Sequence, residues 1–241
     1  MNSHDLYQNI SEYCIANRGD EASVKKYSRF FKEGYDGYGL SAPLMYAKSK
    51  ELLKLPDISM ETVLEALPLI FKNGRYEEIS IALLVLDGFS KQYTKGTLRK
   101  VESFYKMGIT NWAHADTLGM FILPKFIKRN VIRYSEMKPW LNAENKFQRR
   151  SVPVTLIKLL KTTDDFEPLF YFIEPLLMDP EREVHQGVGW FLREAWKLKH
   201  NETELFLMKW KDKAPRLIIQ YATEKMTSDQ KQLYKRSKTS K

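Results

Sequence analysis

The chain has 241 residues, of which 43% are hydrophobic and 13% aromatic, and these proportions are typical of a folded protein with a substantial core. Its one cysteine, Cys14, excludes an intramolecular disulfide framework. Because the sequence shows no signal-like start and no long apolar run, we expect neither a secreted nor a membrane-spanning protein. We therefore expect a cytoplasmic protein. The net charge of +9 favours a polyanionic partner such as nucleic acid, with a solvated basic surface as the alternative.

Helical periodicity runs through almost the whole chain and predicts an all-α protein of roughly 13–14 short helices. The earliest helices, around Leu6 to Tyr13, are expected either to cap the fold or to contact DNA. Clear later examples of three- and four-residue apolar spacing are Ile79, Leu83, Leu86 and Phe89, and then Val152, Leu156, Leu159 and Leu160.

The expected helix starts repeat along the chain. Asn111, Asn145 and Asp179 each occupy a position suited to an N-cap, and they are spaced 34 and 34 residues apart. Pro180 would then take the first helical position, and Ala214-Pro215 opens another helix about 35 residues later. A repeat of this length with two helices per unit is typical of a HEAT-like α-solenoid, a curved superhelix with a concave face.

No long linker divides the chain, so we expect a single domain over residues 1–226 and a polar, basic tail over 227–241 that is partly disordered. Positive charge is concentrated in two places. Residues 125–150 hold eight Lys or Arg against two Glu, and residues 195–241 hold twelve against five acids. The cations that we expect to contact DNA phosphates lie in the first of these stretches: Lys125, Lys128, Arg129, Lys146, Arg149 and Arg150.

Several kinds of catalytic site lack support in the sequence. The four histidines and the single cysteine do not have the spacing of metal ligands, so we expect no metal. The chain also lacks a phosphate-binding glycine loop and a Gly-x-Ser-x-Gly elbow, which argues against nucleotide-dependent and serine-hydrolase activities. We expect the protein to work without a cofactor.

One constellation of residues does suggest chemistry. Trp112 and Asp116 are four residues apart, so they lie on one face of a helix. Arg150 has the same offset from Asn145 that Asp116 has from Asn111, and equivalent positions in stacked repeats lie about 10 Å apart. An aromatic ring, an acid and a guanidinium on successive repeats are thus predicted to share one groove.

Trp190 is the fourth candidate. If its helix begins at Asp179, Trp190 is rotated roughly 120° away from this stripe, whereas a helix start displaced by two residues would bring it onto the stripe. Gly187 and Gly189 leave space beside it for a neighbour or a ligand. The structural alternative is that both tryptophans are core residues, that Asp116 satisfies a nearby N-terminal amide, and that Arg150 pairs with an acid in the next repeat.

Three segments, in this order and spacing, resemble the bacterial DNA alkylation repair family, the AlkD-type alkylpurine DNA glycosylases. They are Asn111–Asp116 (NWAHAD), Asn145–Arg150 (NKFQRR) and Gly187–Glu194 (GVGWFLRE). The similarity runs over most of the chain. It implies a HEAT-like superhelix with a basic concave face, acting as a monomer on double-stranded DNA. It also implies hydrolytic excision of cationic N3- and N7-alkylated purines, such as 3-methyladenine and 7-methylguanine, without a metal and with the lesion left stacked rather than flipped out.

The resemblance also implies roles for single residues. Trp112 and Trp190 resemble the stacking aromatics of the family, Asp116 its catalytic acid, and Arg150 its phosphate-contacting arginine. Cleavage of the bond between an alkylated base and the sugar develops positive charge on C1′. A carboxylate can stabilise this charge and position a water, while indole faces favour a nearby cation.

The chain departs from the family pattern at four positions. Ala113 and His114 stand where active members usually carry a second Trp and an acid, and Arg182 and Glu183 stand where the family has aromatic residues. Glu183 is expected to repel phosphate. These departures leave two alternatives to the enzyme open. One is a non-catalytic HEAT-repeat protein that binds branched or damaged DNA, and the other is a protein-interaction solenoid.

Overall fold

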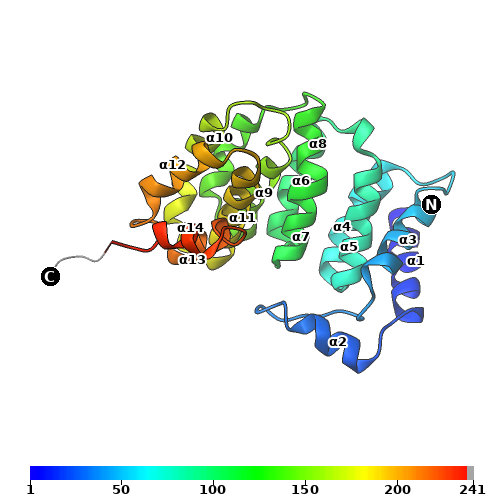
Figure 1. The fold of residues 1–241 in the computed structure, drawn as a ribbon. Helices are drawn as coiled ribbons and strands as arrows, with labels where there is room; N and C mark the ends of the chain where they lie inside the picture. The colour runs from blue at the N-terminus through cyan, green and yellow to red at the C-terminus, as the bar shows by residue number, and fades with distance from the viewer. Residues whose placement is uncertain (238–241) are drawn as a thin grey trace. The chain divides into compact units, whose positions relative to one another are not determined.

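The structure, a computed structural model, describes residues 1–237, and within them it holds fourteen α-helices and no strand (Figure 1). The all-α fold predicted from the sequence is therefore confirmed. The chain forms two compact units, Met1–Val131 and the part that follows from Ile132. The boundary lies in the short connection between Lys128 and Tyr134, inside the range 1–226 for which the sequence predicts a single domain. No helix of the described chain has both the length and the apolar character needed to cross a membrane.

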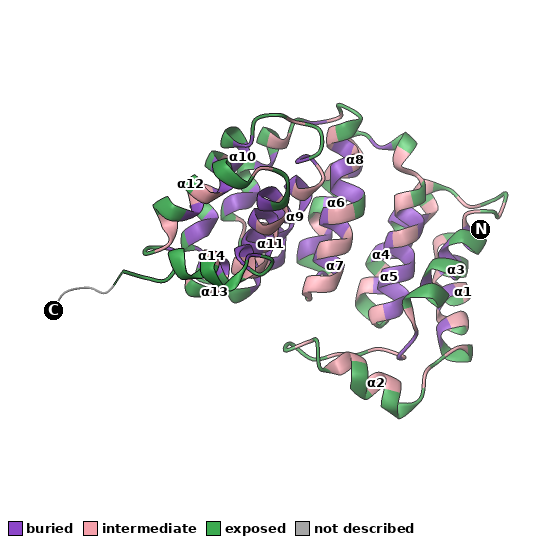
Figure 2. Ribbon diagram, in the orientation of Figure 1, coloured by how far each residue is buried: buried purple, intermediate pink, exposed green. Residues whose placement is uncertain are grey.

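The first unit is built around α5, which is buried along most of its length (Figure 2). Its predicted core residues Ile79, Leu83 and Leu86 are all buried, and α5 packs against α1, α3, α4 and α7. In chain order, the elements of this unit are α1 (Ser3–Ala16), α2 (Glu21–Ser28), α3 (Ala42–Leu52), α4 (Met60–Asn73), α5 (Tyr76–Gly88), the 3-10 helix η1 (Ser90–Gln92), α6 (Lys95–Met107), α7 (Trp112–Thr117), the π-helix η2 (Leu118–Ile122) and α8 (Leu123–Lys128).

A single turn of π-helix joins α7 to α8, so that residues 112–128 run as one continuous helical segment. Pro124 explains the π turn, because it has no N–H to donate to the carbonyl four residues earlier. The N–H of Leu123 instead reaches back five residues to the Leu118 carbonyl. Turns of this kind are frequent beside functional sites, and this one follows directly after the Trp112 and Asp116 turn.

The second unit is built on α9, α11 and α13, which alternate with other helices along the chain, since α11 packs against both α9 and α13. The predicted core residues Val152, Leu156, Leu159 and Leu160 are buried. The elements are the 3-10 helix η3 (Tyr134–Asn142), α9 (Lys146–Ile157), α10 (Glu167–Ile173), the 3-10 helix η4 (Glu174–Met178), α11 (Arg182–Leu198), α12 (His200–Trp210), α13 (Arg216–Ala222) and α14 (Ser228–Leu233).

The helix starts confirm the repeat. The N-caps of α5, α7, α9, α11 and α13 are 36, 34, 36 and 34 residues apart: Arg75, Asn111, Asn145, Glu181 and Pro215. The predicted cap at Asp179 is wrong, because α11 begins two residues later. Asp179 ends η4 in extended conformation, and its carboxylate accepts the N–H of Glu181 at 2.8 Å.

The segment predicted to be a polar tail is ordered over its described part. Thr227 caps α14, and the ring of Tyr234 is buried at the end of that helix. The guanidinium of Arg216 donates to the Tyr234 carbonyl at 2.6 Å. The last residues of the predicted tail, 238–241, lie outside the described chain.

Candidate nucleic-acid site

The first turn of α7 presents Trp112 and Asp116 on one face of the helix. Asn111 caps this helix by accepting the N–H of His114 at 2.9 Å, so Trp112 is the first helical residue and Asp116 follows one turn later. Both side chains are partly exposed. The sequence prediction that the ring and the carboxylate share a helix face is therefore confirmed.

A segment far away in the sequence fixes the indole of Trp112. The indole N–H donates to the carbonyl of Phe30 at 2.9 Å, and the indole ring stacks on Phe31 with centroids 5.5 Å apart and planes 17° apart. Phe31 in turn stacks on Tyr35, with a centroid distance of 5.3 Å and an angle of 24°. The three near-parallel rings Tyr35, Phe31 and Trp112 form what we call the ring column.

The segment that carries Phe31 and Tyr35 is not among the site residues predicted from the sequence. Residues 25–38 interleave basic and aromatic side chains, a pattern that suits nucleic-acid binding because cations neutralise phosphates while rings stack on bases or sugars. Phe30 leaves 62% of its surface exposed beside Trp112. The exposed cations of the segment are Lys25, Lys26, Arg29 and Lys32.

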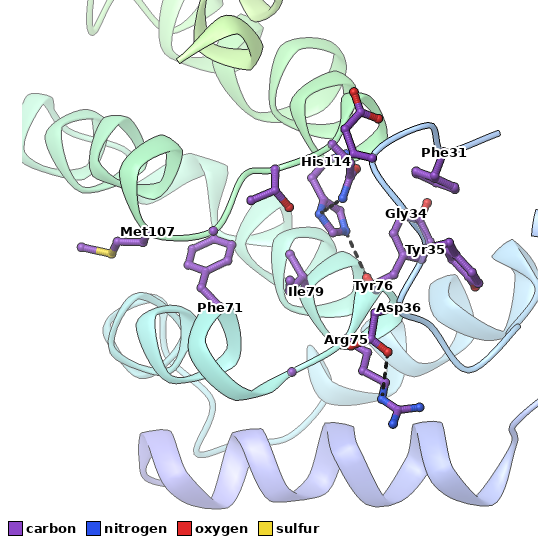
Figure 3. A pocket seen from close by; sticks show the side chains of 15 residues that line it. Phe31, Gly34, Tyr35, Asp36, Phe71, Arg75, Tyr76, Ile79, Met107 and His114 are labelled. Atoms are coloured by element: carbon purple, nitrogen blue, oxygen red, sulfur yellow. Dashed lines mark hydrogen bonds and ion pairs between the residues drawn. The ribbon is translucent and has the colours of Figure 1, made fainter. Parts of the chain in front are cut away.

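A cavity of about 510 Å³ lies beside the ring column (Figure 3). Phe31 and Tyr35 border it on one side, Phe71 and Met107 on the other, and Tyr76 between them. Its volume is within the range of small-molecule sites. Asn111 and His114 also line the cavity, so it reaches the start of α7, but the side chains of Trp112 and Asp116 do not line it.

His114, one of the four departures from the family pattern, is a buried packing residue. Its Nε2 lies 3.0 Å from the Tyr76 carbonyl and 3.1 Å from Ser80 Oγ, and its Nδ1 lies 3.0 Å from the side-chain nitrogen of Asn111. The imidazole also stacks on the Tyr76 ring at 4.8 Å. Burial lowers the pKa of His114 to about 4, so the ring is neutral at physiological pH and ties α7 to α5.

We expect His114 to make the protein acid-sensitive. Because its folded pKa is about 4 and its unfolded value is near 6.5, the unfolded chain binds more protons between these values. The free energy of unfolding should thus fall by about 3 kcal/mol as the pH drops from 7 to 4. Urea unfolding at pH 7, 6, 5 and 4 would measure the change. His114→Gln serves as the reference, and equally steep pH dependence in both proteins would contradict the assignment.

Most of the predicted DNA-binding cations make contacts within the protein. In the first unit, the Lys125 ammonium lies 2.6 Å from the Asp87 carboxylate, and the Arg129 guanidinium donates to the Lys91 carbonyl at 3.0 Å. Burial raises the pKa of Asp87, and Lys125 offsets part of that rise. Lys128 is exposed and has no hydrogen-bond or ion-pair partner among residues 1–237.

In the second unit, Arg149 is held in a fully bonded position. Its Nε lies 2.6 Å from the Asp179 carboxylate, whose side chain is only 4% exposed. Another guanidinium nitrogen, Nη1, donates to the carbonyls of Ala143 and Glu144 at 2.6 and 3.0 Å. This network joins the start of α9 to the turn before α11, which is a structural role.

Arg150 and Lys146 also bind the start of α11. Arg150 is 5% exposed, and its guanidinium donates to the Glu183 carbonyl at 2.7 Å. Lys146 lies 3.1 Å from the Glu183 carboxylate, so the acid that the sequence suggests would repel phosphate has its charge compensated. Arg182, the neighbouring departure, is exposed. Arg150 thus bonds to the following repeat through a backbone carbonyl.

The later start of α11 brings Trp190 into register. Gln186 lies five residues after the Glu181 cap, as Asp116 and Arg150 lie five residues after their own N-caps. Trp190 lies one helical turn after Gln186, on the same face of α11. The ring is partly exposed, and its N–H has no hydrogen-bond partner within the described chain.

The two glycines near Trp190 serve helix packing. A Cβ on Gly187 would lie 3.1 Å from Cγ of Arg150, and one on Gly189 would lie 2.9 Å from the Ile218 carbonyl oxygen. They let α11 approach α9 and α13 closely, so the space that they leave is filled by neighbouring helices.

These contacts predict different behaviour for two neighbouring lysines. Lys128→Ala should weaken DNA binding and reduce the slope of log affinity against log salt by about 1, because a free ammonium can neutralise one phosphate. Lys125→Ala should instead lower the free energy of unfolding, because it leaves the half-buried Asp87 without its cation. Fluorescence anisotropy over a salt series and urea unfolding would separate the two effects. An unchanged slope for Lys128→Ala would exclude it from the phosphate contacts.

No group of three His, Cys, Asp or Glu side chains in residues 1–237 is arranged to hold a metal ion.

Comparison with solved structures supports the helical-repeat fold. A predicted DNA alkylation repair enzyme from Enterococcus faecalis matches with a TM-score of 0.73 at 16% identity, over 88% of this chain and 98% of that one. AlkD2 from Streptococcus mutans matches with a TM-score of 0.57 at 19% identity, over 86% and 99% of the two chains.

The protein smu.31 from Streptococcus mutans UA159 also matches, with a TM-score of 0.59 at 17% identity, over 92% of this chain and all of that one. A search of curated proteins gives no match. At these identities the structural matches show the fold alone. The model of the DNA alkylation repair enzyme family, however, matches residues 15–226, which is most of the chain. The chain therefore belongs to the DNA alkylation repair enzyme family.

Proposed function

We propose that the protein is a DNA glycosylase that hydrolyses the N-glycosidic bond of cationic N3- and N7-alkylated purines in double-stranded DNA. One observation carries the proposal. Asp116 stands one helical turn from Trp112, whose indole is fixed by a hydrogen bond to Phe30 and a stack on Phe31. A carboxylate beside an immobilised aromatic surface suits a reaction that builds positive charge on a sugar.

The chemistry needs little beyond these groups. The alkylated base is already a cation and therefore a good leaving group, so the protein has to stabilise the developing charge on C1′ and the ring oxygen. The Asp116 carboxylate would supply that stabilisation and orient the attacking water. The Trp112 face would attract the cationic base or the sugar edge. No metal or organic cofactor is part of this mechanism.

DNA binding in this proposal rests on cations that the protein leaves accessible. These are the exposed Lys128 and the basic side chains of residues 25–32. The proposed phosphate contact of Arg150 and the proposed stacking of Trp190 stay predictions. A phosphate contact would require the Arg150 guanidinium, which donates a hydrogen bond to the Glu183 carbonyl in this structure. The helical register of Trp190 favours its proposed stacking role. We propose that the protein acts in the cytoplasm as a monomer.

Release of free base from methylated DNA tests the proposal. Duplex DNA treated with a methylating agent would be incubated with the protein, and released 3-methyladenine and 7-methylguanine would be measured by chromatography. We expect release of at least one of them above the spontaneous rate. Untreated DNA is the control. Absence of release, at protein concentrations that saturate the DNA, would reject the enzymatic function.

A second candidate is a non-catalytic protein that binds damaged or branched DNA. The observation that favours it is the neutral, buried His114 at the position where active family members usually carry an acid. It predicts salt-dependent binding to DNA with no release of base. The same assay, with binding measured in parallel, separates the two functions.

A further inference from the structure

The ring column ends in a buried carboxylate that lies away from the proposed site. Glu77, on the first turn of α5, is completely buried. Its Oε1 accepts the Tyr35 hydroxyl at 2.5 Å, the Gly39 N–H at 2.8 Å and the Leu40 N–H at 3.0 Å, while its Oε2 accepts the Tyr38 N–H at 2.8 Å. One side chain thus fixes the whole turn that carries Tyr35.

The backbone of this turn is shaped for the carboxylate. Gly39 has a φ of +77°, a conformation that glycine adopts without strain, and the N–H groups of three successive residues converge on Glu77. Successive amides around a positive-φ residue form a concave anion site. Four donors on one buried acid satisfy it without a cation, which makes the arrangement rigid and costly to rearrange.

Two sets of contacts connect the turn fixed by Glu77 to the Trp112 indole. The first is the ring column itself, in which the Tyr35 ring stacks on Phe31 and Phe31 stacks on Trp112. The second is the backbone, because the carbonyl that accepts the Trp112 indole N–H belongs to Phe30, five residues before Tyr35. The indole lies at the free end of the column, one turn from Asp116.

We propose that Glu77 and Tyr35 are positioning residues that set the plane of the Trp112 ring for the alkylated nucleotide. This inference rests on the proposed glycosylase function, because it assigns Trp112 a place against the substrate. Neither Glu77 nor Tyr35 needs to touch DNA. The Glu77 carboxylate accepts a hydrogen bond from the Tyr35 hydroxyl, and the Tyr35 ring stacks on Phe31. Phe31 in turn stacks on Trp112, so the ring column keeps the indole in one orientation.

Two substitutions test the route with little change of shape. Tyr35→Phe keeps the ring and the stack but removes the hydroxyl that Glu77 accepts. Glu77→Gln keeps the size but turns part of the acceptor into a donor that faces backbone N–H groups. The matched control is Tyr38→Phe, which removes a hydroxyl from the same turn. That hydroxyl is 3.4 Å from Glu78, and its ring lies outside the column.

The readouts are chosen to separate positioning from folding. With 5-fluorotryptophan incorporated, the ¹⁹F resonance of Trp112, assigned by its loss in Trp112→Phe, should shift or broaden in Tyr35→Phe and Glu77→Gln but not in Tyr38→Phe. The single-turnover rate of base release should fall about tenfold in Tyr35→Phe, with DNA affinity within about twofold of wild type, since small misplacements of a positioning group cost rate.

An unchanged Trp112 resonance in both Tyr35→Phe and Glu77→Gln would overturn the proposal, as would an equal effect of Tyr38→Phe. If Glu77→Gln does not fold, Tyr35→Phe alone decides. The ¹⁹F measurement does not depend on catalysis. Should the wild type release no base, the glycosylase function fails, and with it the substrate role of the column. The resonance would still show whether Glu77 and Tyr35 hold the indole.

Discussion

Asp116→Asn should reduce the rate of base release by about 100-fold or more, because the amide has the same size as the carboxylate but cannot compensate positive charge developing on the sugar. DNA affinity should stay equal or increase slightly, since the substitution removes a negative charge close to the phosphates. Single-turnover kinetics on DNA with one 7-methylguanine, together with equilibrium binding to the same duplex, would measure both quantities.

The control for this change is Glu65→Gln, which removes one negative charge from an exposed position on α4 in the same unit. It should leave the rate of base release within about twofold of wild type, as most exposed substitutions have small effects. If Asp116→Asn and wild type release base at the same rate, Asp116 is not the catalytic acid. If both Asp116→Asn and Glu65→Gln lower the rate alike, the effect comes from overall charge.

Arg149→Met should lower the free energy of unfolding by about 3 kcal/mol, because it leaves the buried Asp179 carboxylate without its cation. The substitution also removes the donor to the carbonyls of Ala143 and Glu144. Urea unfolding monitored by circular dichroism would measure the loss. The slope of DNA affinity against salt should stay the same, since this guanidinium is occupied within the protein.

Arg129→Met is the matched control for this prediction. It removes an exposed guanidinium whose one hydrogen bond within residues 1–237 is to the Lys91 carbonyl, so we expect a change in the free energy of unfolding of no more than about 0.5 kcal/mol. A small effect of Arg149→Met on stability, combined with a salt slope lower by about 1, would support the phosphate contact that the sequence suggests.

The sequence by itself determined the helical repeat, because the signals that specify helices and their caps are local. Apolar spacing shows where a helix runs, and the side chains of Asn111 and Asn145 cap their helices by bonding to amides within three residues. Helical spacing, which is also local, predicted that Trp112 and Asp116 share one face. The predicted cap at Asp179 was wrong, and the Asp179 carboxylate also pairs with Arg149 from another repeat.

Only the tertiary structure decided what the charged and aromatic side chains contact. The sequence does not distinguish a cation that contacts DNA from one that bonds to the next repeat. In the structure, Arg149 bonds to the Asp179 carboxylate and Arg150 to the Glu183 carbonyl. The ring column could not be predicted either, since it joins Trp112 to residues about 80 positions earlier. Helix starts depend on near neighbours, whereas contacts between distant segments depend on how the helices pack. The sequence therefore located Trp112 and Asp116, and packing determined how the indole is held.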